Sequence, residues 1–98
     1  MASQFVFGNT TSLLGTLESH GHAVSYVDAT DVVNVAAALT PATRIVFVET
    51  IANPRVQVAD LAKIGALCRE RGILYVVDNT MTSPWLFQPR HVNAGLIV

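Results

Sequence analysis

The stretch Ile73–Pro84, ILYVVDNTMTSP, decides the fold of this chain. It opens with five apolar residues, rich in β-branched and aromatic side chains, which follow Gly72 and precede a polar turn. This pattern predicts a strand covered on both faces, as in a parallel sheet. Asp78 ends the strand, and in open α/β sheets ligands bind outside the carboxyl ends of the strands. Position alone supports equally a ligand contact and a plain turn or helix cap at Asp78.

The rest of the chain alternates expected strands and helices. We expect strands at Gln4–Phe7, Ala23–Val27, Arg44–Val48, Ile73–Val77 and Leu96–Val98. We expect helices from a Ser12 N-cap to about His20, from an Asp31 cap to Leu39, from Val58 to Arg71, and as one turn over Ser83–Phe87. Connections of this length between strands predict an α/β fold with a doubly wound, mainly parallel sheet in three α/β/α layers.

Apolar spacing indicates which helix faces are buried. In the first helix we expect Leu13, Leu14 and Leu17 to face the sheet. In the longest helix, one face is lined by Leu61, Ile64, Gly65 and Cys68, and Gly72 ends the helix. The segment Ile51–Arg55, with its Asn53-Pro54 pair, is expected to be a loop.

Composition excludes several classes of protein. Of 98 residues, 51% are hydrophobic and 13% charged, which is too apolar for a disordered chain and suggests surfaces that more protein covers. The net charge of −1, with scattered basic residues, argues against nucleic acid as a partner. No apolar run has the length of a membrane span, and the N-terminus lacks the features of a signal peptide. The single cysteine, Cys68, fits a cytoplasmic protein.

Most residues that could carry chemistry have a simpler structural explanation. Gly8 and Gly15 lack the spacing and the lysine of a phosphate loop. The histidines at 20, 22 and 91 have no cysteine or acidic partner nearby, so a metal site is not expected. Cys68 lies on the apolar face of its helix and is assigned to the core.

Three residues follow neighbouring strands and are candidates for a ligand site. Phe7 ends the first expected strand, Glu49 the third and Asp78 the fourth. With the strand order 2-1-3-4-5, the switch point of the sheet falls between the first and third strands, beside Phe7 and Glu49. An aromatic face together with carboxylates could hold a flat, cationic heterocycle.

Two motifs resemble one known family. Val48–Pro54, VETIANP, and Val76–Pro89, VVDNTMTSPWLFQP, closely resemble the Cys/Met-metabolism enzymes that depend on pyridoxal phosphate (PLP). This family includes cystathionine γ-synthase, cystathionine lyases, methionine γ-lyase and the homoserine-ester sulfhydrylases. The resemblance covers essentially the whole chain, including Phe7–Thr10, FGNT, and Val27–Thr30, VDAT. It implies part of the large, cofactor-binding domain of a fold-type I enzyme of transsulfuration or methionine biosynthesis.

The resemblance also implies roles for particular residues. Asp78 would pair with the pyridinium nitrogen of PLP, and Phe7 would stack on the ring. Asn53 would lie near the phenolic oxygen of the ring, and Thr80 would line the pocket beside Asp78. Glu49 would be an acid that positions its neighbours.

The chain also departs from the family pattern. The stacking residue is commonly Tyr, whereas Phe7 has no hydroxyl; this favours the sulfhydrylase branch. Ile51 stands where Pro is common. The resemblance places the phosphate-binding segment before Met1, the Schiff-base lysine after Val98, and a further C-terminal domain beyond that. Residues 1–98 are therefore expected to be a fragment of the large domain, without a catalytic residue of its own.

Two interpretations follow from the sequence. In the first, the chain is an inactive part of a PLP enzyme that carries out γ-replacement or γ-elimination on a homoserine ester or sulfur amino acid, and the complete enzyme is a homo-oligomer, a tetramer in the family. Lys63, the only lysine, is not expected to bind the cofactor, because it lies on a polar helix face. In the second, the chain is a free-standing, flavodoxin-like binding module without catalysis.

Overall fold

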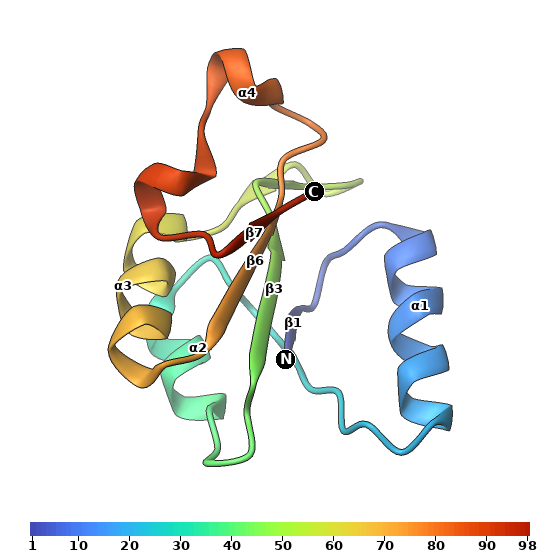
Figure 1. Cartoon of the computed structure of the whole chain (residues 1–98). Helices are drawn as coiled ribbons and strands as arrows, with labels where there is room; N and C mark the ends of the chain where they lie inside the picture. The colour runs from blue at the N-terminus through green and yellow to red at the C-terminus, as the bar shows by residue number, and fades with distance from the viewer.

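Two five-residue strands form the centre of the sheet in the computed structural model, which describes residues 1–98 (Figure 1). They are β3 (Ile45–Glu49) and β6 (Leu74–Asp78), and they run parallel. Their register pairs Val48 with Val77, both buried, and ends with Glu49 beside Asp78. The apolar run of β6 thus forms the predicted central strand, and it brings the two acidic residues to one edge of the sheet.

Three two-residue strands extend the sheet on both sides. They are β1 (Ala2–Ser3), β2 (Tyr26–Val27) and β7 (Leu96–Ile97). The order is β2-β1-β3-β6-β7, and every neighbouring pair is parallel. This confirms the predicted order 2-1-3-4-5 and the α/β fold class, with the switch point between β1 and β3.

Helices α2 (Val32–Ala38) and α3 (Leu61–Arg71) cover one face of the sheet (Figure 1). The Asp31 side chain caps α2 by accepting a hydrogen bond from the Val33 N–H at 2.9 Å, as predicted. Gly72 ends α3 in the left-handed conformation, with φ 63°, which also confirms its prediction. Between these helices and the sheet lies the core, formed by Ala29, Val35, Val46, Val48, Ile64, Cys68, Tyr75 and Val77.

Helix α1 (Gly8–Ser19) lies on the other side of the sheet and stands apart from it (Figure 1). It has no buried residue, and the side chains of Leu13 and Leu17 are 59% and 38% exposed. The prediction that Leu13, Leu14 and Leu17 face the sheet was therefore wrong, although Leu14 is partly buried. The spacing of apolar residues predicts the helix itself. The leucine side chains, however, are not buried against the sheet.

The first predicted strand, Gln4–Phe7, was also wrong. The ladder with β2 ends at the hydrogen bond from the Gln4 N–H to the Val27 carbonyl, and the chain then leaves the sheet. Phe7 instead occupies the N-cap of α1, so the helix begins four residues before the predicted Ser12 cap. The apolar Phe5-Val6-Phe7 run resembles a strand, yet the Phe7 N–H bonds a side chain, the Glu49 carboxylate, and not a neighbouring strand.

Beyond β3, the expected loop is partly ordered as an antiparallel hairpin of β4 (Ile51–Ala52) and β5 (Gln57–Val58). Because Val58 belongs to this hairpin, α3 begins at Leu61 and not at Val58. After β6 come the predicted helical turn α4 (Ser83–Leu86) and a 3₁₀ turn, η1 (Pro89–Val92), which leads to β7. No helix in this chain has the length and apolarity needed to span a bilayer.

Burial makes the single thiol unreactive. Cys68 is 1% exposed, and its removal from water raises the pKa of the thiol to about 11. A rise in pKa of this size lowers the thiolate population at pH 8 roughly a hundred-fold. We expect a disulfide reagent such as DTNB to leave native Cys68 unmodified and to label it stoichiometrically in guanidinium. Rapid labelling of the native protein at pH 8 would contradict this burial.

Candidate functional site

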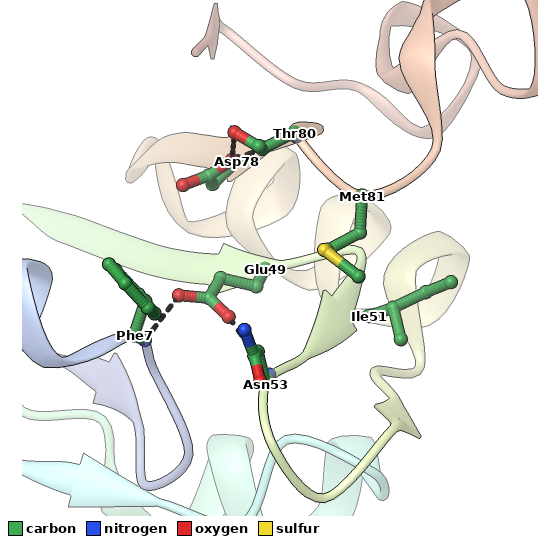
Figure 2. Close-up of a pocket in the computed structure, with 7 residues that line it drawn as sticks. All are labelled: Phe7, Glu49, Ile51, Asn53, Asp78, Thr80 and Met81. Carbon is green, nitrogen blue, oxygen red and sulfur yellow. Dashed lines mark hydrogen bonds between the residues drawn. The ribbon is translucent and has the colours of Figure 1, made fainter.

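A cavity of about 250 Å³ lies at the carboxyl edge of the sheet (Figure 2). We call it the edge pocket; it is lined by Phe7, Glu49, Ile51, Asn53, Asp78, Thr80 and Met81. It gathers three distant parts of the chain: the start of α1, the β3–β4 segment and the end of β6. All five residues singled out from the sequence, at positions 7, 49, 53, 78 and 80, lie around this one pocket.

Asp78 is held by the residue two positions ahead of it. Its Oδ1 accepts hydrogen bonds from the Thr80 N–H at 2.9 Å and from the Thr80 hydroxyl at 2.6 Å. Its other oxygen makes no hydrogen bond within the chain and points away from Thr80 (Figure 2). The turn therefore fixes the carboxylate while leaving one oxygen able to accept a hydrogen bond from a ligand.

A second Asp-x-Thr turn follows β2. There the Asp28 Oδ1 accepts hydrogen bonds from the Thr30 N–H at 3.0 Å and the Thr30 hydroxyl at 2.7 Å. Both hydrogen bonds lower the pKa of Asp28, and the one from the Thr30 backbone has the larger effect. Asp28 does not line the edge pocket, although its turn matches that of Asp78. The Asp-x-Thr turn alone therefore does not place an acidic residue in the edge pocket. Asp78 lines the pocket because it ends the central strand β6.

Buried polar residues tie the end of β6 to its neighbours. The Thr50 N–H donates to the Asp78 carbonyl at 2.9 Å, and Thr50 is 2% exposed. Buried Asn79 accepts a hydrogen bond from the Thr82 hydroxyl through Oδ1 and donates through Nδ2 to the Phe87 carbonyl at 3.0 Å. These contacts explain why threonine and asparagine surround the acidic residues in both motifs: they satisfy buried polar groups where the strands end.

Glu49 links two walls of the edge pocket. Its Oε1 accepts a hydrogen bond from the Phe7 N–H at 2.6 Å, and its Oε2 accepts one from the Asn53 N–H at 3.4 Å (Figure 2). The side chain is 6% exposed. One buried carboxylate therefore binds the backbone of both neighbouring segments, and charged hydrogen bonds of this kind are stronger than neutral ones.

The apolar part of the pocket comes from Phe7, Ile51 and Met81. The Phe7 ring is 50% exposed and lies beside the cavity, where the start of α1 places it. Met81 was not predicted as a site residue, and Ile51 was noted only as standing where Pro is common in the family. The available signal was position, since each lies within three residues of an acidic strand end.

The remaining candidates lie elsewhere. Neither the three histidines nor Cys68 lines the pocket, and no group of three potential metal ligands occurs in the chain. Lys63 is exposed on α3 and pairs with Asp60 at 3.0 Å. The edge pocket therefore contains no basic side chain of this chain.

The chemistry of the lining fits a flat, protonated heterocycle. Two carboxylates and no basic group favour a cation. Phe7 offers an aromatic face to a ring, and the free oxygen of Asp78 can accept a hydrogen bond from a ring N–H. The cavity of about 250 Å³ is a little smaller than the roughly 300 Å³ of most ligand pockets, and it has room for one ring system.

Comparison with known proteins identifies similar chains. The family model described as "Cys/Met metabolism PLP-dependent enzyme" matches residues 1–98. A chloroplastic cystathionine beta-lyase of Mimosa pudica is 35% identical over 99 residues, covering all of this chain and 22% of the relative. The solved O-acetylhomoserine sulfhydrylase of Wolinella succinogenes has 38% identity and a TM-score of 0.91, covering 98% of this chain and 28% of that one.

A third similar protein is a putative O-acetylhomoserine (thiol)-lyase of Campylobacter jejuni, with 28% identity and a TM-score of 0.91. Its structure contains N'-pyridoxyl-lysine-5'-monophosphate, and the match covers 98% of this chain and 24% of that one. The chain thus spans about a fifth to just over a quarter of the length of these three proteins.

Proposed function

The chain belongs to the Cys/Met metabolism PLP-dependent enzymes, and from this premise we propose that it forms one side of the cofactor pocket of such an enzyme. PLP is the cofactor of the family. The observation that carries the proposal is the edge pocket, in which Phe7, Asn53, Asp78 and Thr80 surround a single cavity. The proposal assigns residues 1–98 to part of the large domain of a longer protein.

Within this proposal, Asp78 binds the protonated ring nitrogen. Thr80 occupies one carboxylate oxygen, so the second oxygen is available and correctly held. When bound, PLP supplies an electron sink that stabilises negative charge on the substrate, and an acidic partner at the ring nitrogen strengthens that sink. Thr80 thus orients the acidic residue, and Asp78 keeps a proton on the ring nitrogen.

The other residues hold the ring in place. Phe7 stacks on one face of the ring, and Asn53 is assigned to the phenolic oxygen. Glu49 acts through its neighbours, because it binds the backbone of Phe7 and Asn53 and reaches the ring only through them. We regard Glu49 as a positioning residue.

For the complete enzyme, we propose γ-replacement on a homoserine ester with a sulfur nucleophile, in a cytoplasmic homo-oligomer. The similarity to the sulfhydrylase of Wolinella succinogenes supports this reaction, as does Phe7 at the stacking position. Lyases are also similar to this chain, so elimination from a sulfur amino acid is the competing reaction.

Assays of the full-length protein separate these reactions. We expect turnover of O-acetylhomoserine with sulfide to exceed, in kcat/KM, the release of keto acid from cystathionine or methionine. If kcat/KM is instead higher for the release of keto acid, the protein is a lyase, and the proposed cofactor site still stands. Absence of PLP from the purified protein, together with failure to bind added PLP, would refute the cofactor site itself.

Phe7 is expected to contribute to cofactor affinity by ring contact. Replacing Phe7 by Ala removes the aromatic face, and we expect the Kd for PLP of the full-length apoenzyme to rise about tenfold, a typical cost for an aromatic pair and its buried area. Phe7→Tyr keeps the ring and is expected to change the Kd by less than about threefold. Fluorescence titration measures both, and equal affinity of Phe7→Ala and wild type would exclude the stacking role.

A further inference from the structure

A second cavity, of about 10 Å³, lies where β1, β3 and the β4–β5 hairpin meet. We call it the inner cavity. Its lining includes Ser3, Glu49, Ala52 and Gln57. A volume of this size is about that needed to hold one water molecule and too small for an organic ligand.

Gln57 places a buried acceptor at this cavity. The Gln57 Oε1 is fully buried and has no hydrogen-bond partner in the chain, the only such side-chain atom found. Buried polar atoms nearly always have partners, and an unpaired one is costly. Exchanging the amide oxygen and nitrogen would bury an N–H₂ donor in the same place. The oxygen needs a partner that donates and the N–H₂ a partner that accepts, and a water molecule can serve as either.

Four further polar residues line the same cavity: Ser3, Asp28, Thr30 and Glu49. The Asp28 carboxylate already accepts hydrogen bonds from the Thr30 N–H and the Thr30 hydroxyl. The Ser3 Oγ accepts a hydrogen bond from the Phe5 N–H at 3.4 Å, and no acceptor in the chain takes its own hydroxyl hydrogen. Glu49 has a carboxylate with lone pairs beyond the two backbone hydrogen bonds it accepts. Gln57, Glu49 and Ser3 therefore offer two acceptors and one donor at the inner cavity, close to the three hydrogen bonds of a typical buried water.

We propose that one ordered water molecule occupies the inner cavity, donating to the Gln57 Oε1 and to the Glu49 carboxylate and accepting from the Ser3 hydroxyl. Glu49 lines both the inner cavity and the edge pocket. The water thus hydrates the side of this buried carboxylate that faces the hairpin, and it satisfies Gln57 as well. This inference stands on the inner cavity and its polar atoms, and it holds whichever ligand the edge pocket takes.

A crystal structure of the full-length protein, at a resolution that shows ordered water, tests the proposal. We expect a density peak about 2.7–3.2 Å from the Gln57 Oε1 in the wild type. Gln57→Met keeps the size of the side chain without its acceptor, and the peak should be lost or fall well below half occupancy. Gln57→Glu keeps an acceptor at that position, and the peak should remain.

Three results would overturn the proposal. In the first, the wild-type map shows no peak in the inner cavity. In the second, an N–H group from a part of the full-length protein outside residues 1–98 donates a hydrogen bond to the Gln57 Oε1. Crystals grown with rubidium could show an anomalous signal at the peak, which would identify a monovalent cation and not water. Because the wild-type map decides each of these, the test does not depend on whether a Gln57 variant folds.

Discussion

Asp78→Asn is expected to lower kcat/KM of the full-length enzyme by about 10²–10³-fold, the usual cost of removing one well-placed electrostatic partner. An amide has the shape of the carboxylate but no negative charge, so it no longer favours a proton on the ring nitrogen. The fold should survive, since the Asn Oδ1 can still accept both hydrogen bonds from Thr80. The measurements are steady-state kinetics and the absorbance spectrum of bound PLP.

Asp28→Asn is the matched control, because Asp28 follows β2 in the same type of turn and lines the inner cavity but not the edge pocket. We expect kcat/KM to stay within about threefold of the wild type, because the Asn Oδ1 can still accept both hydrogen bonds from Thr30 and no contact in the edge pocket is lost. Equal losses in the two variants would show that the turn matters for folding and that Asp78 has no special role. An unchanged Asp78→Asn enzyme would remove Asp78 from the site.

Gly65→Ala is expected to be the most destabilising small substitution in the chain. A Cβ at Gly65 would lie 1.7 Å from the carbonyl oxygen of Val92 and 3.2 Å from Cε1 of Tyr75. The obstacle is backbone, which cannot rotate away, so α3 and η1 must separate and disrupt packing around buried Tyr75. We expect a loss of about 3 kcal/mol, at the upper end for overpacking.

Gly15→Ala tests the same chemical change in open space. Gly15 lies within α1, and nothing is within 4 Å of the position of its Cβ. Alanine in a helix is favoured over glycine by about 0.5–1 kcal/mol, so the apparent melting temperature should rise slightly, whereas that of Gly65→Ala should fall by several degrees. A Gly65→Ala protein as stable as the wild type would mean that α3 and η1 are not in this close contact.

The parts of the fold that could be predicted are those with a strong local cause. The apolar run of β6 predicted a central strand, and Gly72 predicted the end of α3, because glycine readily adopts a positive φ. Crossover lengths predicted a parallel, doubly wound sheet, and the order 2-1-3-4-5 assumed for such a sheet is the one observed. Asp78 could be placed at the edge because the carboxyl ends of parallel strands lie together.

One error arose where a distant residue decides the backbone conformation. Phe5-Val6-Phe7 has the composition of a strand, but the Glu49 carboxylate, 42 residues away, binds the Phe7 N–H and the chain turns into α1. Local propensity cannot represent this contact. The hairpin of β4 and β5 was missed for a different reason: Ala52 pairs with Gln57 only five residues away, and the Asn53-Pro54 pair between them is typical of a loop.

The site was predicted better than the segments that carry it. Phe7, Glu49 and Asp78 were placed at one edge from topology, while Asn53 and Thr80 came from the family resemblance, and all five line the edge pocket. Ile51 and Met81 were missed because apolar residues in a turn carry no chemical signal of their own. Which roles these residues perform stays a prediction until the variants are measured.

The two hydrogen bonds of Glu49 have a mechanical consequence. A single short side chain joins the segment before α1 to the segment after β4, so neither wall of the edge pocket can swing outward without breaking a charged bond or moving the other wall. We therefore expect the opening of the pocket to be a concerted motion. Amide hydrogen exchange at positions 7 and 53 should be correlated, and both amides should exchange faster together when Glu49 is replaced by Ala.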